Sequence, residues 1–128
     1  DVARPCVRIE DIELLLGMIA DHPVGGLLAN RVRDTMKRGV GDEVAETVPR
    51  DDLWHALTPQ VFRYGVLREA LQQARDEGIA VTDESQAIER RGEKPLLVES
   101  ARDNIKITWP EDLQLAEAFL KLQEEAGL

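Results

Sequence analysis

The stretch from residue 9 to residue 32 reads IEDIELLLGMIADHPVGGLLANRV and predicts a helix followed by a buried strand. In its first part, Ile12, Leu15 and Ile19 recur at helical spacing behind an acidic first turn, and Pro23 marks the stop. Its second part is short and largely apolar, as in a strand buried in a sheet. A helix that packs on such a strand indicates an α/β fold.

The alternation of helices and strands continues to the end of the chain. Apolar residues at helical spacing predict a second helix around residues 67–74 and a short third helix within residues 82–92. The stretch at residues 53–62 starts as a further strand, and strands are also predicted at residues 95–100 and 104–108. This order favours a mainly parallel sheet flanked by helices, with right-handed crossovers. We find no internal repeat and no domain boundary.

Two helices have recognisable start signals. Either Thr82 or Asp83 is expected to cap the short third helix. The last helix has the clearest start, because Thr108 and Glu111 have the spacing of a capping box and Pro110 lies in the first turn. These signals predict where both helices begin.

Residues 33–50 predict a β-hairpin inserted between two elements of the sheet. Its two strands, Thr35 to Arg38 and Val44 to Val48, flank a turn that contains Gly39, Gly41 and Asp42. The hairpin has few large apolar residues, so we do not expect it to form part of the core. We expect it to project from the body and to be covered by a partner.

Composition excludes several classes of function. The net charge of −9 and the 4% aromatic content argue against a nucleic-acid binder, which needs a basic face and stacking platforms. No apolar run approaches the roughly 18 residues of a membrane span. The single Cys6 cannot form an internal disulfide and reads as a packing residue. We therefore expect a cytoplasmic protein with small-molecule partners, no nucleic acid and no membrane.

Polar residues after predicted strands are candidate site residues, because ligands of open α/β sheets bind beyond the carboxyl ends of the strands. Thr35, Thr58 and Lys106 meet this criterion. Lys106 alternates with Ile105 and Ile107, which puts its ammonium on the opposite face of the predicted strand. The alternative reading is that Lys106 protects an edge strand from pairing.

Three further charged residues stand out in predicted loops. Asp1 and Arg4 lie three residues apart at the start, and Arg50 lies between Pro49 and Asp51. Their spacing alone fits a loop salt bridge between Asp1 and Arg4 and a solvated charge at Arg50.

Five motifs occur in order along the whole chain. They are DVARP at 1–5, RDTMKR at 33–38, LWHALTPQVF at 53–62, TDESQAIE at 82–89 and DNIKITWPEDL at 103–113. Together they resemble the bacterial 2-C-methyl-D-erythritol 4-phosphate cytidylyltransferases of the non-mevalonate isoprenoid pathway. The related ribitol-phosphate cytidylyltransferases share the TPQ and NIKIT pieces, whereas LWHAL and TDESQA are more similar to the methylerythritol enzymes.

The resemblance implies a Rossmann-like sheet of the nucleotide-diphospho-sugar transferase type. In that family a DAARP-like motif lies near the middle of a chain almost twice as long. Residues 1–128 are therefore expected to be the C-terminal part of a single nucleotidyltransferase domain, with residues 33–50 as a dimerisation arm. The Gly-rich loop that holds CTP in the family has no counterpart here, so we expect the fragment alone to be inactive.

The resemblance also implies a reaction and its participants. CTP and 2-C-methyl-D-erythritol 4-phosphate would give 4-diphosphocytidyl-2-C-methyl-D-erythritol and pyrophosphate, with Mg²⁺ as the cofactor. The resemblance implies that Lys106 is the catalytic candidate and neutralises the sugar phosphate. Asp1 and Arg4 would bind the sugar hydroxyls, with Asp1 also near the metal. Thr35 and Thr58 would donate hydrogen bonds to the substrate, and Arg50 would come from the other subunit of a homodimer. Two alternatives stay open: a ribitol-5-phosphate cytidylyltransferase, and a truncated dimerisation module without catalytic activity.

Overall fold

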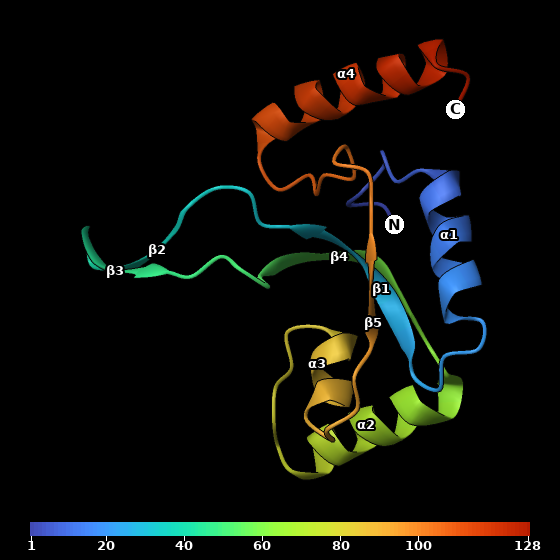
Figure 1. The fold of residues 1–128 in the computed structure, drawn as a ribbon, viewed down its shortest axis with the longest axis vertical. Helices are drawn as coiled ribbons and strands as arrows, with labels where there is room; N and C mark the ends of the chain where they lie inside the picture. Colours follow the sequence, from blue (N-terminus) through green and yellow to red (C-terminus); the bar gives the residue numbers. More distant parts are fainter.

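The structure, a computed structural model, describes residues 1–128 and contains four helices and five strands (Figure 1). In chain order they are α1 (Ile9–Ile19), β1 (Gly25–Arg31), β2 (Met36–Val40), β3 (Glu43–Val48), β4 (Trp54–Phe62), α2 (Tyr64–Asp76), α3 (Glu84–Glu89), β5 (Leu96–Glu99) and α4 (Pro110–Glu125). The quoted stretch 9–32 forms the predicted helix and strand as α1 and β1. No helix has the length and apolar character needed to cross a membrane.

The sheet is mixed, which corrects the prediction of a mainly parallel sheet. Its order is β4-β1-β5, with β1 antiparallel to β4 and parallel to β5. The hairpin is the only element between β1 and β4. At its base the Val32 N–H, just after β1, donates to the Leu53 carbonyl, just before β4 (3.1 Å). The chain thus re-enters the sheet at the end where it left, so β4 must run back along β1. The helical crossover through α2 and α3 makes β5 parallel.

The core lies where helices cover the sheet. One buried cluster joins α1 to the three strands and comprises Leu15, Ile19, Leu28, Leu57 and Val98. A second cluster joins the start of β1 to α2 and α3 and comprises Val24, Ala70, Ala87 and Ile88. Gly25 allows the close approach of β1 to β4, because its φ is +121° and a Cβ there would lie 2.2 Å from the Val61 carbonyl oxygen.

The predicted hairpin is present as β2 and β3, which extend away from the sheet (Figure 1). The strands are joined by a two-residue turn, Gly41 and Asp42, in which Gly41 has a φ of +60°. Gly39 was predicted in the turn but lies within β2. Both strands are exposed, except for the half-buried Val48. An Arg38–Glu46 ion pair (2.9 Å) links them on the outside. The hairpin therefore contributes nothing to the core, as its composition predicts.

Residues 104–108 do not form the predicted strand, nor the edge strand of the alternative reading. They run as an irregular segment beside the N-terminal loop, where the Ile107 N–H donates to the Ala3 carbonyl (2.8 Å). The predicted alternation is nevertheless observed, because Ile105 and Ile107 are half-buried and Lys106 is exposed. The side-chain pattern was read correctly, but the segment packs on a loop instead of a sheet.

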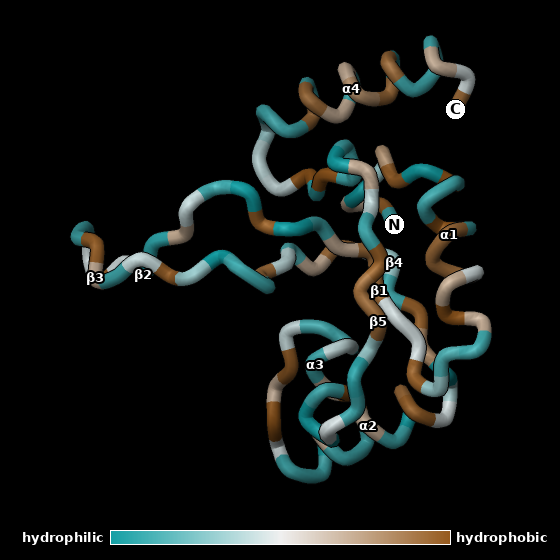
Figure 2. Tube along the Cα trace, viewed as in Figure 1, coloured by the Kyte–Doolittle hydropathy of each residue, from teal (hydrophilic) through white to brown (hydrophobic).

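The start of α4 also differs from the prediction. Trp109 is the last residue with extended backbone, so Asp112, and not Glu111, occupies the third helical position. Its carboxylate accepts hydrogen bonds from the N–H groups of Trp109 (2.8 Å) and Thr108 (3.0 Å), which lower the pKa of Asp112. Along α4 only Ala116 is buried, and apolar residues remain on its surface (Figure 2).

Candidate functional site

Three segments that are distant in sequence meet at one end of the sheet. The N-terminal loop contacts the loop after β5, because Arg4 Nη1 donates to the Asn104 carbonyl (2.8 Å). Asn104 Nδ2 in turn donates to the Thr58 carbonyl of β4 (2.9 Å). The Asp1 carboxylate accepts from the Ala3 N–H (2.9 Å) and from the Thr58 hydroxyl. Asp1, Arg4 and Thr58 are thereby held around Asn104.

The expected salt bridge between Asp1 and Arg4 is not formed. Each side chain has other partners, the carboxylate on Thr58 and the guanidinium on Asn104. Partial burial lowers the pKa of Arg4, although a guanidinium stays charged in proteins. Thr58 also differs from its predicted place, since it lies within β4 and not after it. Its hydroxyl is nonetheless directed to the N-terminal loop.

A hollow of about 420 Å³ opens beside this contact. The polar residues on its wall include Arg4, Asn30, His55, Arg102, Asn104 and Lys106. Asn30 lies near the end of β1 and Arg102 follows β5, so the hollow lies at the carboxyl ends of the two parallel strands. That is the end at which open α/β sheets bind ligands.

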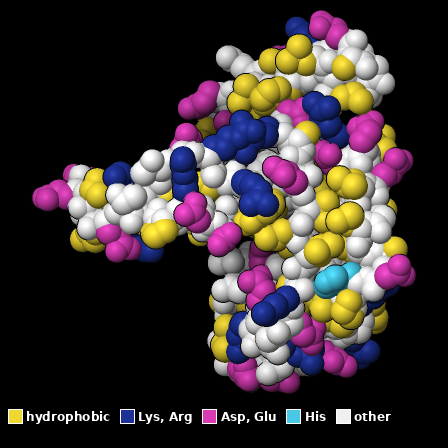
Figure 3. All heavy atoms as spheres, viewed as in Figure 1, with side chains coloured by type: hydrophobic (Ala, Val, Ile, Leu, Met, Phe, Trp, Pro, Cys, Tyr) yellow, Lys and Arg dark blue, Asp and Glu magenta, His cyan; other side chains and the backbone are white.

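The hollow has a positive wall although the chain as a whole is acidic. Arg4, Arg102 and Lys106 face a single carboxylate, Asp112, which is already hydrogen-bonded to the start of α4. Figure 3 shows Lys and Arg side chains gathered on this face between the base of the hairpin and α4. Three cations around a concave surface favour a bound anion such as a phosphate.

The three cations are held differently. Arg4 Nη1 donates to the Asn104 carbonyl, and Arg102 Nη2 donates to the Arg31 carbonyl (3.1 Å). Lys106 is exposed, and its ammonium makes no hydrogen bond or ion pair within the chain. Lys106 is therefore the one cation of the three with every donor free, while each guanidinium has used one of its five N–H donors.

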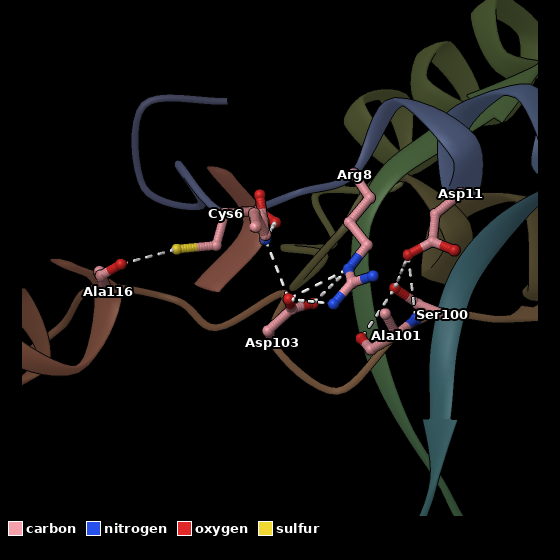
Figure 4. A network of polar contacts seen from close by, with 8 residues as sticks. Cys6, Arg8, Asp11, Ser100, Ala101, Asp103 and Ala116 are labelled. Atoms are coloured by element: carbon pink, nitrogen blue, oxygen red, sulfur yellow. Dashed lines mark hydrogen bonds and ion pairs between the residues drawn. The ribbon is translucent and has the colours of Figure 1, made fainter. Parts of the chain in front are cut away.

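A second polar network fixes the loop that carries Asn104 and Lys106 (Figure 4). Arg8 binds Asp103 with two nitrogens, Nε to Oδ1 at 3.1 Å and Nη2 to Oδ2 at 2.7 Å. Gln123 Nε2 of α4 donates to Asp103 Oδ2 (2.9 Å) and also to the Cys6 carbonyl (2.9 Å). Asp11 supports the start of the same loop by accepting from the Ala101 N–H (3.0 Å).

Thr35 and Arg50 lie apart from the hollow. Thr35 is exposed just before β2, and Arg50 follows β3 and donates to the Arg33 carbonyl. Arg50 lines a separate depression of about 250 Å³ with Asp51 and Asp52. Within one chain, the structure therefore brings together four of the six predicted site residues, namely Asp1, Arg4, Thr58 and Lys106.

Arg102, Asn104 and His55 were not among the predicted site residues. Asn104 is 2% exposed and its Oδ1 has no hydrogen-bond partner, so it is a buried polar residue at the wall of the hollow. Its place directly before the Ile105–Lys106–Ile107 alternation was a usable signal. Arg102 follows β5, the last strand of the sheet, which is the kind of position at which site residues are expected.

The carboxylates near the hollow limit how a metal ion is held. No three His, Cys, Asp or Glu side chains cluster as a metal site. Asp1 offers one carboxylate on an exposed residue. Mg²⁺ commonly takes one or two carboxylates together with waters and substrate phosphates, so a single aspartate fits that mode of binding and not a preformed protein cage.

Comparisons with known proteins identify the family of the chain. The family model of 2-C-methyl-D-erythritol 4-phosphate cytidylyltransferase matches residues 1–122. Proteins of that name from Vibrio atlanticus and Pectobacterium atrosepticum are 51% and 50% identical to this chain, and they match 98% and 94% of it. The matched regions are 54% and 51% of those proteins, so the chain spans about half the length of these curated relatives.

Solved structures give the same result. The 2-C-methyl-D-erythritol 4-phosphate cytidylyltransferase from Francisella tularensis has a TM-score of 0.87 and 38% identity over 93% of this chain and 56% of that one. The enzyme of the same name from Thermus thermophilus has a TM-score of 0.85 and 34% identity over 94% of this chain and 59% of its own. Because the family model covers nearly all of its residues, the chain belongs to the 2-C-methyl-D-erythritol 4-phosphate cytidylyltransferase family.

Proposed function

We propose that the complete protein containing residues 1–128 transfers a cytidylyl group from CTP to 2-C-methyl-D-erythritol 4-phosphate. The observation that carries this proposal is the cationic hollow, where Lys106 has no partner within the chain and Arg4 is fixed beside it. The relatives and solved structures named above all bear the methylerythritol name. They support this substrate over ribitol 5-phosphate.

The reaction suits a site without an activated nucleophile. A phosphate monoester has a second pKa near 6 and is mostly a dianion at neutral pH. One of its oxygens attacks the α-phosphorus of CTP, and the bond from that phosphorus to the bridging oxygen breaks, so that pyrophosphate leaves. The substrate supplies its own nucleophile, so the protein needs no general base. Its task is to bring two polyanions together and to stabilise charge during transfer.

We assign roles to the residues around the hollow on this basis. Lys106 neutralises the phosphate of methylerythritol phosphate and holds its attacking oxygen. Arg4 and Asp1 hydrogen-bond the sugar hydroxyls, and the Thr58 hydroxyl, which donates to Asp1 here, helps to orient that carboxylate. The Arg4 guanidinium is pre-positioned by its bond to the Asn104 carbonyl, so little order must be created when substrate binds.

We further infer that Asp1 supplies one ligand to Mg²⁺, with the remaining ligands from water and the triphosphate. When bound, this ion neutralises charge on the phosphates of CTP. The carboxylate is exposed and accepts from the Thr58 hydroxyl, and Thr58 is bonded in turn to Asn104 in the wall of the hollow.

The remaining parts of the proposal concern assembly. We propose that residues 1–128 are the C-terminal part of one nucleotidyltransferase domain and that residues 33–50 form a dimerisation arm. Arg50, at the base of this arm, would then serve the site of the other subunit, which accounts for its position outside the hollow in one chain, and Thr35 would donate to the substrate. A cytoplasmic location fits the free thiol of Cys6.

Pyrophosphate release by the complete protein tests the proposal. We expect turnover with CTP and methylerythritol phosphate, with a much lower kcat/KM when ribitol 5-phosphate replaces the sugar phosphate. Higher activity on ribitol 5-phosphate would support the sister activity instead. No release with either substrate would favour the non-catalytic dimerisation module. We expect purified residues 1–128 alone to release none, because the CTP-binding loop of the family has no counterpart in this stretch.

A further inference from the structure

Asp103, in the loop after β5, has a nearly buried carboxylate that is bound by two other side chains. Its side chain is 9% exposed, and its two carboxylate oxygens accept from Arg8 and Gln123. The Arg8 guanidinium approaches with two parallel donors, the geometry that gives charge-assisted pairs their strength and direction. The Arg38–Glu46 pair of the hairpin, by contrast, is exposed on both sides.

Burial makes this pair sensitive to the loss of either partner. Burial by itself would raise the pKa of Asp103, but the hydrogen bonds from Arg8 and Gln123 outweigh it and hold the pKa below its usual range. A buried carboxylate without its cation is strongly unfavourable. The loop at Asp103 is therefore held in place by its side chain.

The loop depends on this anchor because it has no regular secondary structure. From Asp103 to Lys106 its internal support is one bond from the Ile105 N–H to the Asp103 carbonyl (2.8 Å). Asn104, between them, carries the carbonyl that binds Arg4 and the amide that binds Thr58. A shift of Asp103 would thus displace the Asn104 carbonyl that binds Arg4 and the backbone of Lys106.

We propose that Arg8, Asp103 and Gln123 form a clamp that positions Asn104 and Lys106 for the sugar phosphate. None of the three lines the hollow, so they are positioning residues that act through its wall. Gln123 extends the clamp to α4 and, through the Cys6 carbonyl, to the N-terminal loop that carries Asp1 and Arg4. This inference rests on the proposed function of the same hollow.

The test is steady-state kinetics and calorimetric binding of methylerythritol phosphate with the complete protein. Asp103→Asn and Arg8→Ala should raise the KM and the Kd for methylerythritol phosphate by about 10- to 100-fold, the effect of misplacing a binding group by about 1 Å. The KM for CTP should change less than about twofold. Arg8→Lys should keep part of the affinity, since it retains the charge but not the two-donor geometry.

Two further variants separate positioning from stability. Gln123→Leu is milder, because the Arg8–Asp103 pair remains, and we expect a smaller rise in the same KM. Arg90→Ala is the matched control, since it removes the Arg90–Glu77 ion pair between α3 and α2, away from the hollow. We expect it to lower the melting temperature without changing either KM.

The outcomes distinguish the clamp from the function on which it rests. If Lys106→Met weakens methylerythritol phosphate binding but the clamp variants do not, the clamp is overturned and the proposed function stands. If the clamp variants lower only the melting temperature or the active fraction, their role is structural and the clamp is again overturned. If Lys106→Met has no effect on this substrate, both proposals fail.

Discussion

At the scale of single residues, the site combines fixed and free cations. Arg4 and Arg102 are each tied to a backbone carbonyl, whereas Lys106 is exposed and unpartnered. A fixed guanidinium is suited to holding a ligand in one orientation. The flexible lysine can follow a phosphate as its charge changes during transfer. Under the proposed function, the arginines and the lysine of the hollow therefore have different tasks.

The low native pKa of Asp103 predicts how the stability of the protein depends on pH. Its native pKa lies below the value of about 3.9 that an unfolded aspartate has. A carboxyl with a depressed native pKa stabilises the fold above the unfolded pKa and loses that contribution as pH falls through the native pKa. We expect Asp103→Asn to lower the free energy of unfolding by about 1–3 kcal/mol at neutral pH, and this difference should shrink below about pH 4.

Urea unfolding of the complete protein between pH 7 and pH 3 measures this difference. Asp42→Asn is the control, because Asp42 is exposed at the hairpin turn and forms no ion pair. A wild-type advantage that grows on acidification would contradict the account of Asp103.

At the scale of elements, the first helix, the first strand and the hairpin were predictable because each follows from local patterns. Apolar spacing and Pro23 defined α1, and the glycines at the turn defined β2 and β3. The direction of β4 was not predictable from its own residues. It depends on the hairpin returning the chain to the end of β1 that it left.

The segment 104–108 shows the same limit at the site. Alternation correctly placed Lys106 opposite Ile105 and Ile107, because burial on one side produces this pattern in a strand or in an extended loop. What the segment packs against depends on the tertiary structure and not on the local sequence. The same holds for Asn104, whose contacts with Arg4 and Thr58 join residues far apart in sequence.

The short helix α3 gives a prediction at this scale. The sequence left Thr82 and Asp83 as alternative caps, and in the structure Asp83 Oδ1 accepts from the Gln86 N–H (2.8 Å). Asp83 Oδ2 also accepts from Gln60 Nε2 of β4 (3.1 Å), which ties the helix to the sheet. We expect Asp83→Ala to destabilise the protein by about 0.5–2 kcal/mol and Thr82→Ala by less. Urea unfolding of the two variants checks this, and equal losses would argue against Asp83 as the cap.

At the scale of the whole molecule, the exposed apolar surface fits a chain that is part of a larger unit. Trp109, which precedes α4, is 67% exposed, Leu113 and Leu122 of α4 are 58% and 60% exposed, and Ile9 of α1 is 69% exposed. Figure 2 shows apolar stretches along both helices. Surfaces of this kind are normally covered. They support the proposal that residues 1–128 belong to a longer nucleotidyltransferase domain.

The proposed arm predicts that Arg50 acts in the site of the other subunit. Subunits that carry Arg50→Ala are mixed with subunits that carry Lys106→Met. In a mixed dimer with shared sites, one site has both lesions and the other has neither. Random mixing of equal amounts should then restore about a quarter of wild-type activity. Activity no higher than that of the parent variants would contradict a contribution from the partner subunit.

The central claim is that Lys106 in the cationic hollow binds the sugar phosphate. Its loss removes a charge-assisted contact worth about 1.5–3 kcal/mol, or about 10- to 150-fold in affinity or rate. If this contact forms equally in the ground and transition states, the loss raises the KM for methylerythritol phosphate; if it strengthens during transfer, the loss lowers kcat.

The most direct measurement is the steady-state kinetics of Lys106→Met in the complete protein, with each substrate varied in turn and a melting curve recorded. Lys121→Met is the matched control, since Lys121 is an exposed lysine of α4 outside the hollow. We expect kcat/KM for methylerythritol phosphate to fall about 10- to 150-fold, with little change in the KM for CTP or in the melting temperature. Unchanged kinetics together with a large drop in the melting temperature would show that Lys106 serves the fold instead of the substrate.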